Sequence, residues 1–98
     1  MRTSVLLSLQ RALLGAVTPN MRAICVGWDE KLIRIRAIYD GEIDDEDRER
    51  FSEVGTKVIA DFSAPMAIEE ECVRLDPPER LVSLGLKEWV YWRYEPSP

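Results

Sequence analysis

Apolar residues recur at spacings of three and four in two stretches of the chain, a pattern that predicts two amphipathic helices with one buried side each. We expect the first helix over residues 3–16, and the turn-forming run at residues 18–20 ends it. We expect the second helix to run to about residue 62, with Asp44 as its N-cap. Gly55 lies on the apolar side of this second helix, which predicts a close approach of another backbone there.

Four further stretches are expected to form strands, because they are rich in β-forming residues or alternate between apolar and polar side chains. We expect these strands over residues 21–28, 32–39, 66–75 and 86–94, with a loop at residues 79–85. In the second stretch Ile33 and Ile35 alternate with Arg34 and Arg36, which directs the isoleucines into the core and the arginines outward. The first two strands are predicted to form an antiparallel hairpin.

The resulting order, α-β-β-α-β-β, predicts an α+β fold: a two-layer sandwich in which both helices cover one face of a four-stranded, mostly antiparallel sheet. The other face of the sheet is expected to meet solvent or a partner. At 98 residues the chain is expected to form a single domain over residues 1–98, with residues 94–98 as a frayed tail.

The residue types present argue against most enzyme mechanisms. The chain has no histidine, which removes the commonest general base, the commonest zinc ligand and the Ser-His and Cys-His dyads. It also lacks the sequence motifs of a glycine-rich phosphate loop and of a nucleophile elbow. Carboxylates are plentiful, but the sequence singles out no buried pair for acid-base chemistry. We therefore expect no enzymatic activity and no cofactor.

One acidic spacing calls for a test against calcium binding. Asp40, Glu42 and Asp44 have the spacing of the first three ligands of an EF-hand loop. That loop needs Gly at its sixth position and Glu at its twelfth, where this chain has Asp45 and Phe51. We therefore expect no metal, and a capped helix start explains the same residues.

The cysteines and the N-terminal residues indicate a cytoplasmic protein. Cys25 and Cys72 lie in apolar stretches, and we expect two small buried side chains rather than a disulfide. Gln10 and Arg11 interrupt the apolar run near the N-terminus, so neither a signal peptide nor a membrane segment is expected. The net charge of −5 disfavours nucleic acid as a partner.

Acidic residues are concentrated in one part of the chain. Residues 40–53 hold eight acidic and two basic side chains, a net charge of −6, whereas the whole chain carries −5. Such a concentrated field raises the encounter rate with a basic partner by about 10-fold to 10³-fold at low salt. The candidate partner-binding residues are Asp40, Glu42, Asp44, Asp45, Glu46, Asp47 and Glu49. The alternative is an ordinary solvated helix start, where the helix dipole favours acidic side chains.

The predicted fourth strand is rich in aromatic residues. Strict alternation places Trp89 and Tyr91 on one face and Trp92 and Tyr94 on the other, so one buried face cannot cover all four. Exposed Trp and Tyr side chains are typical interface anchors, so Trp89 and Tyr91 join the candidate partner-binding residues. A homodimer joined through this strand is the alternative use of these side chains.

Arg22, Arg34 and Arg36 could share the exposed sheet face with an aromatic residue such as Trp89 or Tyr91, a combination that RNA-binding sheets use. In this chain the third predicted strand carries glutamates at residues 69–71, and alternate ones would face Arg34 and Arg36 across the sheet. Ordinary ion pairs are therefore favoured over RNA binding.

Several short strings resemble one family of small bacterial proteins. These strings are Gln10-Arg11-Ala12-Leu13-Leu14-Gly15, Thr18-Pro19-Asn20-x-Arg22-Ala23, Tyr39-Asp40-Gly41-Glu42-Ile43, Val58-Ile59-Ala60-Asp61-Phe62 and Arg74-Leu75-Asp76. They are similar to immunity proteins of contact-dependent growth inhibition and related polymorphic toxin systems, over residues 4–76. The resemblance implies an inhibitor that binds and neutralises a basic toxin domain of a cognate effector, and it transfers no binding residue. A general protein-interaction module, or a homodimeric structural protein without a toxin partner, is the alternative.

Overall fold

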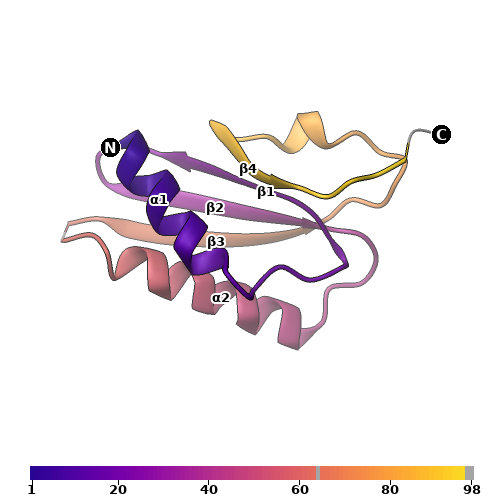
Figure 1. The fold of residues 1–98 in the computed structure, drawn as a ribbon, viewed down its shortest axis with the longest axis horizontal. Coiled ribbons are helices and arrows are strands. Elements are labelled where there is room, and N and C mark those ends of the chain that lie inside the picture. The colour runs from indigo at the N-terminus through magenta and orange to yellow at the C-terminus, as the bar shows by residue number, and fades with distance from the viewer. Residues whose placement is uncertain (64, 97–98) are drawn as a thin grey trace.

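Two helices and four strands make up the fold in the computed structural model, which describes residues 1–63 and 65–96 (Figure 1). In chain order the elements are α1 (Arg2–Leu13), β1 (Met21–Trp28), β2 (Leu32–Tyr39), α2 (Asp45–Ile59), β3 (Ala67–Arg74), the 3₁₀ helix η1 (Leu81–Leu84) and β4 (Glu88–Trp92). The predicted α+β class and element order are confirmed. The first helix ends at Leu13 because Gly15 adopts a left-handed backbone with φ of +79°. η1 lies within the stretch predicted to be a loop.

The sheet has the strand order β3-β2-β1-β4 and is mixed rather than purely antiparallel. β1 is antiparallel to β2, as predicted, and also to β4, whereas β2 and β3 are parallel. The parallel pair arises because α2 leads the chain from the end of β2 back to its start, where Leu32 lies opposite Ala67.

Both helices pack against the same face of the sheet, as predicted, and the main core lies between the two layers (Figure 1). Val5 and Leu9 enter this core from α1, and Phe51 and Val54 enter it from α2. The sheet side of the core includes the fully buried residues Ile24, Val26, Ile33 and Ile35. The two isoleucines of β2 therefore point inward, as the alternation predicted.

The opposite face of the sheet is partly covered by the chain itself. Residues 75–87 fold over it, and Leu81 closes a second small core with Ala23 and Ile38. Farther along this face Arg34 pairs with Glu69 at 3.0 Å, and Arg36 pairs with Glu71 at 3.0 Å. The predicted cross-strand ion pairs are confirmed, and the expectation that this face is open holds for only part of it.

The two cysteines carry free thiols, and their burial differs. Cys25 is fully buried, as predicted, and Cys72 is half-buried on the side of β3 that faces the helices. Removal from water raises the pKa of both thiols. Neither sulfur is therefore an activated nucleophile at neutral pH.

The close approach predicted at Gly55 is present, but a side chain makes it. Glu70 of β3 reaches across α2, and a Cβ on Gly55 would lie 2.6 Å from the Cγ of Glu70 and 2.5 Å from its Cδ. Such distances are far shorter than van der Waals contact. Glycine is therefore required at this position as long as Glu70 keeps its conformation.

We expect the effect of Gly55→Ala on stability to depend on residue 70. In the native background the substitution lowers the free energy of unfolding by about 1 kcal/mol, because Glu70 must be displaced. In a Glu70→Ala background it raises that free energy by about 0.5–1 kcal/mol, because alanine is the better helix former. Urea titration of the four proteins measures the coupling. Equal effects in both backgrounds would contradict this explanation of the glycine.

Candidate protein-binding surface

Three of the seven acidic candidates are used within the fold. Asp44 accepts a hydrogen bond from the backbone N–H of Asp47 at 2.8 Å, and Asp47 accepts one from the N–H of Asp44 at 3.2 Å. This reciprocal capping box fixes the start of α2 and confirms Asp44 as its N-cap. Asp47 is largely buried and also pairs with Arg50. Asp40 pairs with Arg93 at 3.2 Å.

The other four acidic candidates, Glu42, Asp45, Glu46 and Glu49, are exposed. Within the described part of the chain, no Lys or Arg nitrogen lies within 4 Å of their carboxylates. Their charges therefore face water and can act on an approaching molecule. The acidic segment, residues 40–49, thus divides into an internal set that shapes the helix start and an outward set that gives it a negative surface.

β4 carries an irregularity that changes which aromatics share a face. Its pairing with β1 shifts register between Ile24 and Cys25, so that two residues of β4, Val90 and Tyr91, both turn toward the helices. Trp89 and Trp92 consequently lie on the same opposite face, where their rings stack with centroids 5.3 Å apart. The predicted grouping of Trp89 with Tyr91 is therefore wrong, because it assumed unbroken alternation.

The exposed aromatics are those at the end of β4. Trp92 is 54% exposed and Tyr94 is 88% exposed, whereas Trp89 and Tyr91 are half-buried. The expectation that some large aromatics are exposed is confirmed. The two aromatic residues chosen as candidates are the less accessible ones, and a shift of one residue in β4 is the reason.

Arg22 is a buried cation, although the sequence analysis considered it, with Arg34 and Arg36, as an arginine of the exposed sheet face. Only 3% of Arg22 is exposed, and its guanidinium donates to both carboxylate oxygens of Glu95 at 2.7 and 2.8 Å. It also donates to the backbone carbonyls of Leu75 at 2.5 Å and Glu79 at 3.0 Å. Arg22 therefore joins β1, the segment after β3 and the segment after β4. Its position within an apolar strand was the available signal.

Glu95 is held by a second arginine as well. Arg93 donates to the Glu95 carboxylate at 2.9 Å, to Asp40 at 3.2 Å and to the carbonyl of Pro19 at 2.9 Å. The hydrogen bonds from Arg22, followed by those from Arg93, lower the pKa of Glu95 from 4.5 to about 2. Two arginines therefore contact Glu95, which lies within the segment expected to be a frayed tail. Ser97 and Pro98 of that predicted tail lie outside the described residues.

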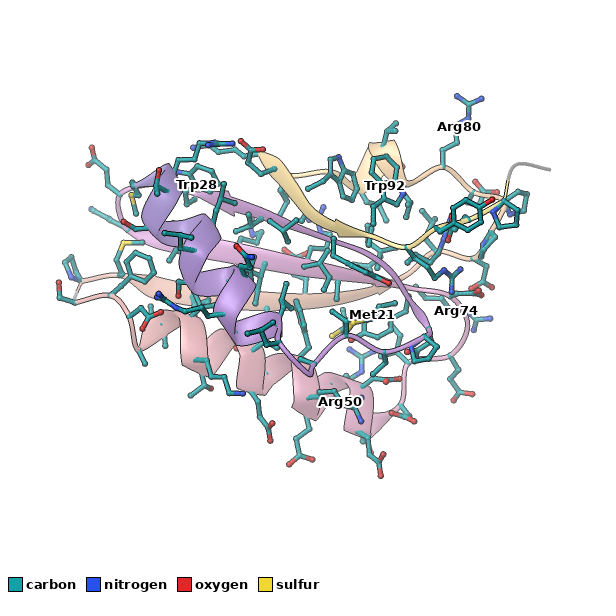
Figure 2. The ribbon with its side chains drawn as sticks, in the orientation of Figure 1. Met21, Trp28, Arg50, Arg74, Arg80 and Trp92 are labelled. Atoms are coloured by element: carbon teal, nitrogen blue, oxygen red, sulfur yellow. The ribbon has the colours of Figure 1, made fainter. Side chains whose placement is uncertain are left out.

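A hollow of about 530 Å³ lies beside the Arg22–Glu95 pair. Its lining is mostly apolar and includes Pro77, Pro78, Leu81, Val82, Trp92 and Pro96. Figure 2 shows Trp92 at this end of β4, with Arg80 pointing outward nearby. A second hollow, of about 450 Å³, lies between α1 and β4.

The described residues contain neither a metal-binding cluster nor a membrane-spanning helix. Among residues 1–63 and 65–96, no three cysteine or acidic side chains converge in a way that could hold a metal ion. None of the helices in those residues is both long and apolar enough to cross a bilayer. The prominent surface features of these residues are carboxylates, aromatic rings and an apolar hollow, and of these the exposed aromatic rings are typical of protein-binding surfaces.

The fold is that of a small α+β protein. The chain belongs to the MafI2 immunity protein family, which it matches over residues 2–95. No curated protein matches it. The resemblance to small bacterial immunity proteins of polymorphic toxin systems is thus confirmed. The match extends past residue 76 and includes β4, which the resemblance alone did not cover.

Family membership implies a toxin-neutralising immunity function and a toxin protein as partner. Immunity proteins of such a family are generally not enzymes.

Proposed function

We propose that the chain is a cytoplasmic immunity protein that neutralises a basic toxin domain by direct binding, with the acidic segment in the interface. The observation that carries this proposal is the exposure of Glu42, Asp45, Glu46 and Glu49 without a cationic partner among the described residues. Side chains that do not satisfy one another remain free to meet positive charges on a second protein.

The distribution of charge along the molecule supports the same proposal. The strand pairings place the start of β1, the ends of β2, β3 and β4, and the start of α2 at one end of the molecule. This acidic end consists of residues 20–22, 39–50, 74–82 and 92–96. It holds ten acidic and six basic side chains, a net charge of −4, and the rest of the chain carries −1. The negative field is therefore directed from one end.

The two sets of carboxylates have different roles in this proposal. Glu42, Asp45, Glu46 and Glu49 meet the basic surface of the toxin directly. Asp44 and Asp47 position them by fixing the first turn of α2 through the capping box. Asp40 acts through Arg93, because their ion pair ties the loop after β2 to the end of β4.

Charge reversal tests the acidic segment. We expect Glu46→Lys to slow association with the toxin domain about 3-fold at low salt, and Glu46→Lys/Glu49→Lys to slow it about 10-fold, because the steering field is weakened. Stopped-flow mixing at several salt concentrations measures these rates, and the differences should shrink as salt is added. Glu30→Lys is the matched control, because Glu30 is equally exposed and lies outside the acidic end.

Equal association rates would contradict a role for the acidic segment. If Glu46→Lys/Glu49→Lys and Glu30→Lys had the same association rate as the native chain, the acidic segment would not guide binding. Growth protection in cells that express the toxin is a second readout. Loss of protection by the double variant, at unchanged thermal stability, supports the proposal.

β4 is an edge strand, and its unpaired backbone groups could join a second copy of the chain in the alternative homodimer. The strand has only five residues and is interrupted by a register shift, two features that oppose pairing between sheet edges. We therefore expect a monomer in light scattering at high micromolar concentration. A stable dimer would favour the alternative.

A further inference from the structure

The hollow beside β4 gathers exposed apolar side chains at the acidic end. Trp92 and Val82 line it, and they are 54% and 67% exposed. Pro77, Pro78 and Pro96 add further apolar lining. Exposed Trp and Val side chains around one concave site provide the apolar area that an interface anchor of another protein buries.

The walls of this hollow are held in place by the fold. Arg22 binds the backbone on one side of it, at Leu75 and Glu79, and the Glu95 carboxylate on the other. The Trp92 ring stacks on Trp89. Because the side chains that line the hollow are already ordered, they lose little conformational entropy when a partner fills it. Binding there therefore costs less free energy than binding to a flexible surface.

The charge around the hollow indicates what kind of partner fits it. The charged residues in its lining sum to zero: Glu95 neutralises Arg22, and the exposed Glu79 and Arg80 carry opposite charges. The acidic end that surrounds it carries a net charge of −4. An apolar side chain with Lys or Arg neighbours complements such a site, and a Trp face also attracts a nearby guanidinium.

We infer that this hollow receives an apolar side chain of the toxin domain, whose basic neighbours meet the acidic segment. The inference rests on the proposed function and adds the anchoring contact to it. The two parts of the surface then govern different rates. The exposed carboxylates set how fast the complex forms, and the hollow sets how slowly it dissociates.

The hollow between α1 and β4 is the competing site, and it lacks this complementarity. Its charged residues, Arg2 and Glu88, pair with each other at 2.7 Å. Leu14 on its rim is 76% exposed, which makes it a matched apolar control for Trp92.

The test measures both rate constants for the full chain against the purified toxin domain from which the chain protects cells. We expect Trp92→Ala to raise the dissociation rate by about 10-fold to 100-fold and to change the association rate less than about 3-fold. Val82→Ser is the second variant, because its exposed side chain on η1 can be changed without disturbing the Trp89–Trp92 stack. It should raise the dissociation rate about 5-fold. Leu14→Ala should leave both rates unchanged.

The outcomes distinguish a failure of this inference from a failure of the proposed function. If Trp92→Ala and Val82→Ser leave dissociation unchanged while Glu46→Lys/Glu49→Lys slows association, the hollow is not the anchor and the proposed function stands. If Leu14→Ala speeds dissociation as much as Trp92→Ala does, the assignment to this hollow is overturned. If the native chain does not bind the toxin domain, the proposed function and this inference both fail.

Discussion

Replacing Glu95 by alanine is expected to lower the free energy of unfolding by about 3 kcal/mol. The reason is the position of Arg22, which is 3% exposed and receives its charge compensation from the two oxygens of Glu95. Without that carboxylate a buried guanidinium is left with backbone carbonyls alone. Urea or thermal unfolding followed by circular dichroism measures the loss.

Glu79→Ala is the matched control for this prediction. Arg22 contacts the backbone carbonyl of Glu79 rather than its side chain, and that side chain is exposed. We expect a change within about 0.5 kcal/mol. Equal stability losses in Glu95→Ala and Glu79→Ala would show that the buried ion pair does not hold the C-terminal segment.

The second large effect is a loss of stability in acid. Glu95 has a pKa of about 2 in the folded chain and 4.5 in its ordinary state, so folding favours the charged form. Its contribution is complete above about pH 5, declines as the pH falls from 5 to 2, and is absent below that. With about a quarter of the side chain exposed, we expect this single group to account for about 2–3 kcal/mol of the loss.

The variant Glu95→Gln separates the contribution of Glu95 to the loss of stability in acid from the contributions of the other acidic residues. Asp29, Asp61 and Asp76 also have lowered pKa values, through hydrogen bonds from the backbone of Lys31 and Leu32, from Ser8 and from Arg74 respectively. The side chains of these three acids are largely in contact with water, so they add little. The free energy of unfolding of Glu95→Gln should therefore vary much less between pH 5 and pH 2 than that of the native chain. Parallel curves for the two proteins would assign the acid sensitivity to other groups.

Short sequence patterns predicted the helices and strands because neighbouring residues determine where these elements form. The β-forming residues at 21–28 and the alternation at 32–39 mark both ends of β1 and β2, and Asp44 marks the start of α2 through its capping box. The parallel pairing of β2 with β3 was missed. It depends on where α2 returns the chain, which no spacing within one segment expresses.

The candidate site could be predicted in part for the same reason. The concentration of acidic residues is visible in the sequence, but their division into capping and outward sets depends on backbone geometry at the start of α2. The faces of Trp89 and Trp92 depend on one irregular pairing with β1. The role of Arg22 depends on Glu95, a residue 73 positions away.

The position of β4 beside β1 determines when the sheet can be completed during synthesis. β1 lies between β2 and β4, so the strand made first among the four has one edge unpaired until the strand made last arrives. Contacts across such a span form late in folding. A ribosome that stalls before residue 88 would therefore release a chain with an open central strand, prone to aggregate and without the surface proposed here to hold the toxin.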